Sequence, residues 1–331
     1  MRFTRADPLP APRHRLPEAA VYFLVGDGRP LIATVGLALQ AAGLFITFQA
    51  ATGHLLPHDL AWLGLTADQL HGLADGRVLK FMIHDRVAFG GAVVGIGGLF
   101  VFLSAGPLKH GHAWSWWAVV LGGLVGFASF LTYLGHGYLD TWHGAATLVI
   151  GPLYLVGVLR SRRLLRHPKS LFAALRPDPT FPVRSAAGLG RALLVTLALC
   201  IALGGLIIMT VGMTTVFVPQ DLAYLRLDRP ALNAVTERLI PLIAHDRAGF
   251  GGAVCATGVA MALCLWSGKP TPALWQAVLL VNLAGFGTAI GVHYPIGYVD
   301  FVHLLPAYLG VAMLTVGLLL TWRRVHAPPA G

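Results

Sequence analysis

The sequence is poor in charge. Only 11% of its 331 residues are Asp, Glu, Lys or Arg, whereas 56% are hydrophobic. A soluble globular domain carries about 25% charged residues, and many apolar runs in this chain approach the roughly 20 residues that span a bilayer. The composition therefore excludes a soluble globular protein and predicts a multi-pass membrane protein.

Cysteine and the common catalytic motifs are also scarce. The three cysteines, Cys200, Cys255 and Cys264, lie in apolar runs without CxxC or CxxCH spacing. This pattern argues against a zinc ribbon, a thioredoxin-type dithiol, covalent c-type haem and an outer disulfide. The sequence also has no HExxH zinc motif, no GxxxxGK[ST] phosphate loop and no GxSxG nucleophile.

Eight apolar runs predict an all-α integral membrane protein. They lie at about 31–50, 83–104, 114–134, 140–159, 191–218, 245–266, 273–292 and 301–322. The first run begins too late and is too long for a cleaved signal peptide, so we expect it to be retained. The predicted parts are a cytoplasmic tail at 1–30, a four-helix repeat at 31–159, a cytoplasmic linker at 160–190, a second four-helix repeat at 191–322 and a cytoplasmic tail at 323–331.

The placement of charge predicts the orientation. The net charge is +10, and most Lys and Arg fall in the two tails, the linker and the loops that share their side. The positive-inside rule then predicts a cell-membrane protein with both termini on the cytoplasmic side. Because these basic residues flank helix ends, attraction to anionic lipid explains them, and we do not expect a nucleic-acid partner.

The two halves of the chain repeat each other. PHDLAWLGL at 57–65 matches PQDLAYLRL at 219–227, IHDRVAFGG at 83–91 matches AHDRAGFGG at 244–252, and GYLDTWH at 137–143 matches GYVDFVH at 297–303. The offsets are 160 to 162 residues. Since each half has an even number of spans, both enter the membrane in the same sense, which predicts a parallel repeat.

Four histidines in the repeated segments are the candidate ligands. His84 and His245 belong to the two HDR triplets, and His143 and His303 begin the fourth and eighth spans. About 19 apolar residues follow Arg86, or roughly 28 Å of helix, so both triplets are expected at the outer end of their spans. All four histidines then share one depth near the outer face.

Carboxylates and arginines are expected to support these histidines. Asp85, Arg86, Asp246 and Arg247 are interpreted mainly as ion pairs, within or between the halves, that also cap the outer helix ends. Asp140 and Asp300 stand three residues before His143 and His303, on the same helix face, where a carboxylate can orient an imidazole towards a metal. Tyr138 and Tyr298 are interpreted as aromatic-belt residues at the lipid headgroups.

The outer loops at 51–80 and 219–238 are long and amphipathic. They predict short helices that lie over the bundle at the interface. Asp59 and Asp221, in the PxDL segments, are interpreted as helix N-caps. The alternative is that they reach the histidine layer from above.

The arrangement of spans and histidines resembles that of haem A synthase. That family has eight spans in two four-helix halves, cytoplasmic termini, and one histidine on the second and fourth span of each half. Phe81 and Leu242 occupy the positions of the family's glutamate. The resemblance implies a haem-binding redox protein in which His84 pairs with His143 and His245 with His303, and which exchanges electrons with a quinone or another membrane redox protein.

Two other functions are consistent with the same residues. The histidines and aspartates could hold zinc or iron in a non-haem membrane enzyme, with an open position that activates water. Alternatively, the HDR triplets are structural clasps in a non-catalytic scaffold or carrier. The substrate and the equivalence of the two repeats do not follow from the sequence.

Overall fold

A computed structural model of the protein describes residues 25–166, 170–182 and 184–327. Within these ranges, eight helices are long and apolar enough to cross a membrane. They are α2 (Arg29–Ala51), α5 (Arg77–Ala105), α6 (Ala113–Ser129), α8 (Thr141–Ser161), α10 (Ala186–Met213), α13 (Leu239–Ser267), α14 (Pro272–Gly291) and α16 (Phe301–Val325). The all-α fold and the eight spans predicted from the apolar runs are confirmed.

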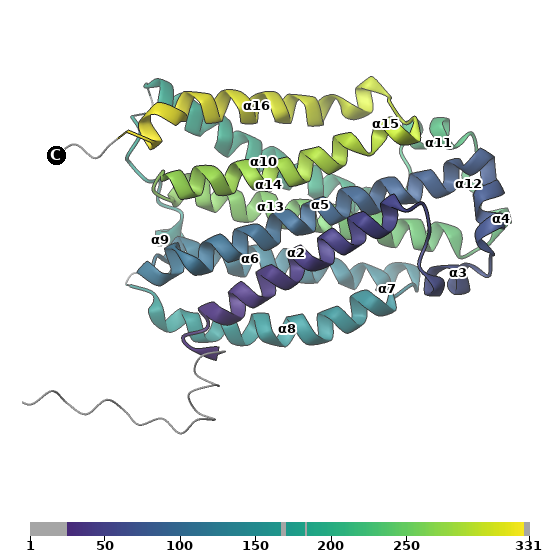
Figure 1. Ribbon diagram of the computed structural model, residues 1–331, viewed down its shortest axis with the longest axis horizontal. Coiled ribbons are helices and arrows are strands. Elements are labelled where there is room, and N and C mark those ends of the chain that lie inside the picture. The colour runs from purple at the N-terminus through teal and green to yellow at the C-terminus, as the bar shows by residue number, and fades with distance from the viewer. Residues whose placement is uncertain (1–24, 167–169, 183, 328–331) are drawn as a thin grey trace, which may run out of the picture.

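Short helices connect the spans. They are α3 (Pro57–Leu63), α4 (Ala67–Gly72), α7 (Tyr133–His136), α9 (Leu171–Ala174), α11 (Pro219–Leu225), α12 (Arg229–Val235) and α15 (His293–Ile296), with 3-10 turns η1 (Leu73–Gly76), η2 (Pro107–His110), η3 (Phe130–Thr132) and η4 (Arg162–Leu164). Figure 1 shows α3, α4, α11 and α12 together at the end of the bundle opposite the start of α2 and the end of α16. The short helices expected in the loops at 51–80 and 219–238 are therefore present.

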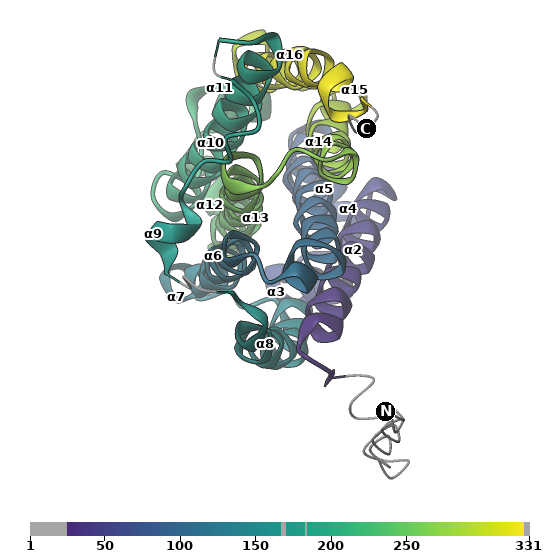
Figure 2. The same cartoon turned by 90° about the vertical axis from the view of Figure 1, so that its left-hand side faces the viewer.

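The helices of the two halves interlock. Viewed along the bundle, α5 and α13 lie in the middle, while α8 and α16 lie at opposite ends of an elongated cross-section (Figure 2). In each half the first long helix packs on the second, α2 on α5 and α10 on α13. The third long helix instead packs on the other half, with α6 on α13 and α14 on α5. A site near α5 or α13 is consequently shared by both halves.

Burial follows this arrangement. The apolar windows of the spans that contain α5 and α13 are 78% and 72% buried, against 17% to 33% in the other six. The HDR triplets sit on these two central helices, so their charged groups are shielded from lipid. Such burial requires every charge to find a partner.

Glycines allow the close approach of the first two helices in each half. A Cβ atom at Gly43 of α2 would lie 2.5 Å from the carbonyl oxygen of Gly90 on α5, and one at Gly205 of α10 would lie 2.6 Å from that of Gly251 on α13. Only a residue without a side chain permits such backbone contact. The small residues after each HDR triplet therefore serve helix packing.

Candidate functional site

The first arginine clasp is centred on Arg86 of α5. Its Nη1 donates to Asp59 Oδ2 of α3 at 2.6 Å, and its Nε donates to Asp246 Oδ2 of α13 at 2.7 Å. All three side chains are buried. Arg86 therefore joins the connecting helix of its own half to the central helix of the other half.

The second clasp, on Arg247 of α13, has the same plan. Arg247 Nη1 donates to Asp221 Oδ2 of α11 at 2.5 Å, and its Nε donates to Asp85 Oδ2 of α5 at 3.3 Å. Each aspartate of an HDR triplet thus accepts from the arginine of the other triplet. The expected ion pairs are present, and they cross between the halves.

The triplets do not cap helix ends. His84 lies about two turns inside α5, which begins at Arg77, and His245 lies nearly two turns inside α13, which begins at Leu239. The predicted capping role of Asp85 and Asp246 is therefore wrong. Both helices begin before the apolar runs, and the short helices α4 and α11 pack on α5 while α12 packs on α13.

Two tyrosines complete the clasps. Tyr138 donates its hydroxyl to Asp59 Oδ1 at 2.6 Å, and Tyr298 donates to Asp221 Oδ1 at 2.8 Å. Both tyrosines are buried, so the predicted aromatic-belt role is wrong. Burial opposes ionisation of Asp59, but the charge and hydrogen bond of Arg86 and the Tyr138 hydroxyl outweigh it, and its pKa lies below the usual value.

Asp59 and Asp221 also act within their own connecting helices. Asp59 Oδ2 accepts the backbone N–H of Leu56 at 3.3 Å, and Asp221 Oδ2 accepts that of Val218 at 2.8 Å. These bonds satisfy donors at the first turn of α3 and α11. The two aspartates sit inside the first turn rather than at the N-cap position, and their side chains bond to the arginines of the triplets.

The second histidine of each expected pair comes from the other half. His84 lies beside His293 and His303, with ring centroids 4.3 and 6.0 Å away, whereas His143 lies beside His245 at 5.2 Å. The predicted pairing of His84 with His143 and of His245 with His303 is wrong. The reason is the exchange of α6 and α14 between the halves, which brings α8 to α13 and α15 and α16 to α5.

The three-histidine cluster consists of His84, His293 and His303, whose candidate ligand nitrogens all lie within 4.8 Å of one another. Each Nδ1 has another partner. His84 Nδ1 is 3.0 Å from Asp85 Oδ1, His293 Nδ1 is 2.6 Å from the carbonyl oxygen of Ala289, and His303 Nδ1 is 3.3 Å from the Tyr298 hydroxyl. The Nε2 atoms are therefore left for a shared ligand.

His293 has a buried ring nitrogen without a hydrogen-bond partner among the described residues. The residue is 4% exposed, and the nitrogen is Nε2. A buried polar atom without a partner costs about 1–3 kcal/mol. The sequence interpretation ranks His136 and His293 below the four repeated histidines, because these two do not align with each other without a one-residue shift.

The two-histidine cluster consists of His143 and His245. Their rings are stacked at 27°, and His143 Nδ1 lies 3.4 Å from His245 Nε2. His245 Nδ1 lies 3.3 Å from Asp246 Oδ1. Here the imidazoles bond to each other, whereas no such bond joins the imidazoles of the three-histidine cluster among the described residues.

Asp140 and Asp300 cap helices instead of orienting imidazoles. Asp140 Oδ1 accepts the backbone N–H groups of Trp142 and His143 at the start of α8, and Asp300 Oδ1 accepts that of His303 at the start of α16. The predicted contact of each carboxylate with the imidazole three residues later is replaced by this cap. The other oxygen of Asp140 lies 3.1 Å from Nε2 of His58.

His58 is a second residue that the sequence reasoning did not select. It forms a compact group with Asp59 and Asp140, and its counterpart in the second half is Gln220. Burial raises the pKa of Asp140, but His143 and the bond from His58 outweigh it and hold the value at about 2. The sequence signal that could have identified His58 is its difference from Gln220, which stands at the matching position of the second half.

Phe81 fills the position where the resembled family has a glutamate. Its ring stacks near His84, with centroids 6.1 Å apart, and the Arg247 guanidinium lies 4.9 Å from the ring centroid. The side chain offers a cation–π contact rather than a ligand. The second clasp is therefore packed against an apolar wall next to the three-histidine cluster.

The fold and these buried polar groups define a multi-pass helical membrane protein with side-chain groups that could hold a metal ion. In comparisons with protein-family models, curated proteins and solved structures, nothing matched the chain.

Proposed function

We propose that the protein is a membrane metalloprotein that binds one transition-metal ion through Nε2 of His84, His293 and His303. The observation that carries the proposal is the buried Nε2 of His293, which has no partner among the described residues and belongs to a group of three histidines with ring nitrogens within 4.8 Å of one another. A metal ion would satisfy that atom. The chain would then bury the cluster without an orphaned polar group.

The chemistry of the donors supports this proposal. Neutral imidazole suits zinc, copper, iron and nickel, and three histidines leave a position open for water or substrate. The Asp85 carboxylate on Nδ1 of His84 fixes the tautomer and raises the basicity of Nε2. A bound metal would supply Lewis acidity or, if it is iron or copper, one-electron chemistry.

The orientation of the site is part of the proposal. The sequence repeat is supported by the recurrence of each clasp bond at corresponding residues, Arg86 with Asp246 and Arg247 with Asp85. The start of α2, α9 of the basic linker and the end of α16 lie at the opposite end of the bundle from α3 and α11 (Figure 1). With cytoplasmic termini, the histidines face the outer side of a cell membrane.

Haem is the second candidate, and the residues fit it less well. Two axial histidines must stand on opposite sides of a porphyrin, but His143 and His245 touch each other directly. The three-histidine cluster is compact and enclosed by Phe81 and Tyr298. What favours haem is an apolar pocket beside His143, which would offer one axial ligand.

A structural clasp explains part of the site but not all of it. The aspartates and arginines of both triplets are fully engaged across the halves, as the scaffold interpretation expects. The histidines of the three-histidine cluster are not needed for these ion pairs. We therefore assign Asp85 and Arg86 to the clasps and His84 to the ligand.

Metal content of the purified protein tests the proposal. We expect about one transition-metal ion per chain by mass spectrometry after dialysis in detergent, and loss of most of it in His293→Ala and His84→Ala. His136→Ala is the matched control, because His136 bonds the carbonyl oxygen of Gly212 outside the cluster. Unchanged metal in both cluster variants would refute the site. A Soret band and a positive pyridine haemochromogen assay on the same sample would instead identify haem.

A further inference from the structure

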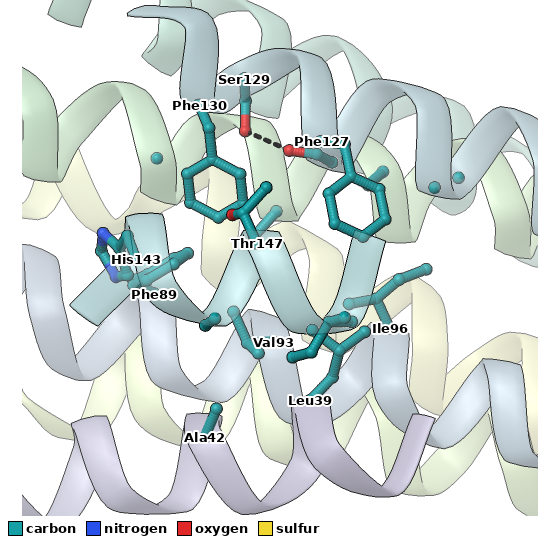
Figure 3. A pocket seen from close by; sticks show the side chains of 18 of the residues that line it. Leu39, Ala42, Phe89, Val93, Ile96, Phe127, Ser129, Phe130, His143 and Thr147 are labelled. Carbon is teal, nitrogen blue, oxygen red and sulfur yellow. Dashed lines mark hydrogen bonds between the residues drawn. The ribbon is translucent and has the colours of Figure 1, made fainter. Parts of the chain in front are cut away.

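A groove on the lipid-facing surface runs between α14 and α16, which pack on each other at one end of the cross-section (Figure 2). It leaves about 520 Å³ that water-sized molecules can reach, and ligand sites typically measure roughly 300–1,000 Å³. The apolar pocket beside His143 leaves only about 100 Å³ by the same measure (Figure 3). The groove therefore has room for a larger molecule than that pocket.

The groove follows the two helices along the membrane span. On α14 its lining recurs every fourth residue from Trp275 to Gly291, and on α16 from Val311 to Leu319. Residues four apart lie on one helix face, and the α14 stripe is roughly 24 Å long. This length is close to that of one side of the bilayer core and more, so the shape fits an extended hydrocarbon chain.

The lining offers a ligand almost no polar contact. Only Asn282 and Thr315 in it have polar side chains besides the indole of Trp275. Asn282 Nδ2 donates to the carbonyl oxygen of Val278 at 2.7 Å, and the Thr315 hydroxyl donates to that of Val311 at 2.8 Å. These donors are satisfied within their own helices, so the groove selects an apolar chain.

Two glycines keep part of the groove open. A Cβ atom at Gly287 or Gly291 would meet no atom within 4 Å, whereas one at Gly43 or Gly205 would meet the backbone of the next helix. Glycine inside a helix is destabilising relative to alanine. Helix packing explains Gly43 and Gly205, but within the described chain no neighbour occupies the space beside Gly287 and Gly291.

Basic residues stand at the end of the groove where α14 begins and α16 ends (Figure 1). Arg323 follows Leu319 by four residues and so lies on the same face, one turn beyond the lining. Arg324 and Lys269 lie at the same end, and all three are exposed. Trp275 lines the groove there, and tryptophan is enriched at the level of lipid head groups.

The positive charge at this end is uncompensated by the described carboxylates. The two that lie there, Asp27 and Asp178, pair with Arg29 and Arg191. Cations beside a bilayer attract anionic head groups. A phosphate at the end of the groove would therefore meet positive charge that the protein leaves unpaired.

We infer that this groove binds an anionic glycerophospholipid, with one acyl chain between α14 and α16 and its phosphate beside Arg323. The apolar stripe and the basic end that follows it match the two parts of one such molecule. The site does not rest on the proposed metal site, because no residue of the three-histidine cluster lines the groove.

A second copy of the chain fits the groove less well. Two copies in the same membrane orientation would meet through the same face about a two-fold axis. Their Arg323 side chains would then lie at one depth and repel each other. A lipid with a negative head group removes this repulsion, so we assign the groove to lipid.

Native mass spectrometry of the full-length protein in detergent tests the inference, because it resolves individual bound lipids. We expect the first phosphatidylglycerol to bind roughly fivefold more tightly than phosphatidylcholine with the same acyl chains, since one arginine near an anionic head group contributes about that factor. Equal affinity for the two lipids would overturn the assignment of an anionic head group.

Two neighbouring arginines test where the head group lies. Arg323→Ala should remove most of the preference for phosphatidylglycerol. Arg324→Ala is the matched control, because residue 324 lies about 100° around the helix from the groove stripe, and it should retain most of the preference. A preference that survives Arg323→Ala, or that falls equally in both variants, would show that general surface charge rather than this groove holds the lipid.

Two glycines test where the acyl chain lies. Gly287→Leu fills the groove without meeting the protein, and the first phosphatidylglycerol should bind about fivefold more weakly because its chain loses packing contacts. Gly285→Leu is the control, since position 285 is equally open but does not line the groove. Unchanged affinity in Gly287→Leu would overturn the site, as would a dimer that only this variant dissociates in sedimentation, because a second copy would then be the occupant.

Metal analysis of the same samples separates this inference from the proposed function. Metal content in Arg323→Ala and Gly287→Leu should equal that of the unchanged protein, because neither residue belongs to the three-histidine cluster. Selective lipid binding without bound metal would refute only the metal site. Bound metal without lipid selectivity would refute only the lipid site.

Discussion

The two histidine clusters lie beside equivalent arginine clasps, but their imidazoles have different hydrogen-bond partners. Each clasp is an arginine bonded to two aspartates, one of which also accepts a tyrosine hydroxyl. On one side three histidines offer ring nitrogens within 4.8 Å of one another, and His293 Nε2 has no partner among the described residues. On the other, two imidazoles bond to each other beside an apolar pocket.

The comparison separates the contacts that occur on both sides from those that occur on one. The clasp bonds, which join the halves, recur on both sides. Within the described residues, the third histidine and the His58–Asp140 contact each occur on one side only. The two sides therefore differ in residues outside the clasps.

Breaking a clasp should give the largest effect. Arg86→Ala and Arg247→Ala each leave two buried carboxylates unpaired, and we expect a loss of about 3–5 kcal/mol in unfolding free energy. Lys80→Ala, at an exposed position on the same helix as Arg86, should change it by about 0.5 kcal/mol at most. Denaturant titration in detergent checks this, and a neutral result for either arginine would show that its clasp is not structural.

The paired tyrosines sharpen the comparison. Tyr298→Phe removes the hydroxyl from both Asp221 and Nδ1 of His303, so metal affinity should fall about 10- to 100-fold. Tyr138→Phe removes the equivalent bond to Asp59 and should leave metal affinity unchanged. Competition with a chelating dye measures both, and equal losses would mean that Tyr298 acts only through the clasp.

Asp140 gives the smallest predicted effect. Its folded-state pKa of about 2 lies below the 3.8 of an unperturbed carboxyl, so ionised Asp140 stabilises the fold above about pH 4. This contribution, about 2 kcal/mol, is lost as pH falls from 4 towards 2.

Asparagine at the same positions tests this pH dependence. Asp140→Asn retains an N-cap but should remove the loss of stability between pH 4 and 2. Asp300→Asn, at an exposed counterpart, should leave the profile as it is. Unfolding followed at several pH values compares them, and identical profiles for the two variants would contradict the role of Asp140.

The sequence predicts the positions of the helices along the chain better than it predicts which helices pack together. Apolar run length identified all eight spans, and amphipathic loops indicated α3, α4, α11 and α12. Four of the ligand candidates were recognised because they recur in both halves. Recurrence also concealed His293, which does not align directly with His136 of the first half, and it suggested pairs within a half.

The pairing error has a physical cause. Periodicity within one helix reports which face is apolar, but both α5 and α13 are apolar on nearly every face, so it carries no information about their neighbours. The exchange of α6 and α14 depends on contacts between residues more than a hundred positions apart. The crossed bonds of Arg86 and Arg247 follow from that exchange.

Because the clasps cross between the halves, they can form only after α13 has been synthesised. When the chain has been made only as far as α8, Arg86 has Asp59 but not Asp246, and His143 has no His245. Neither histidine cluster can form until α13 has been synthesised and has packed against α5. The three-histidine cluster is completed still later, with α15 and α16, so a chain that ends before them lacks two of its three imidazoles.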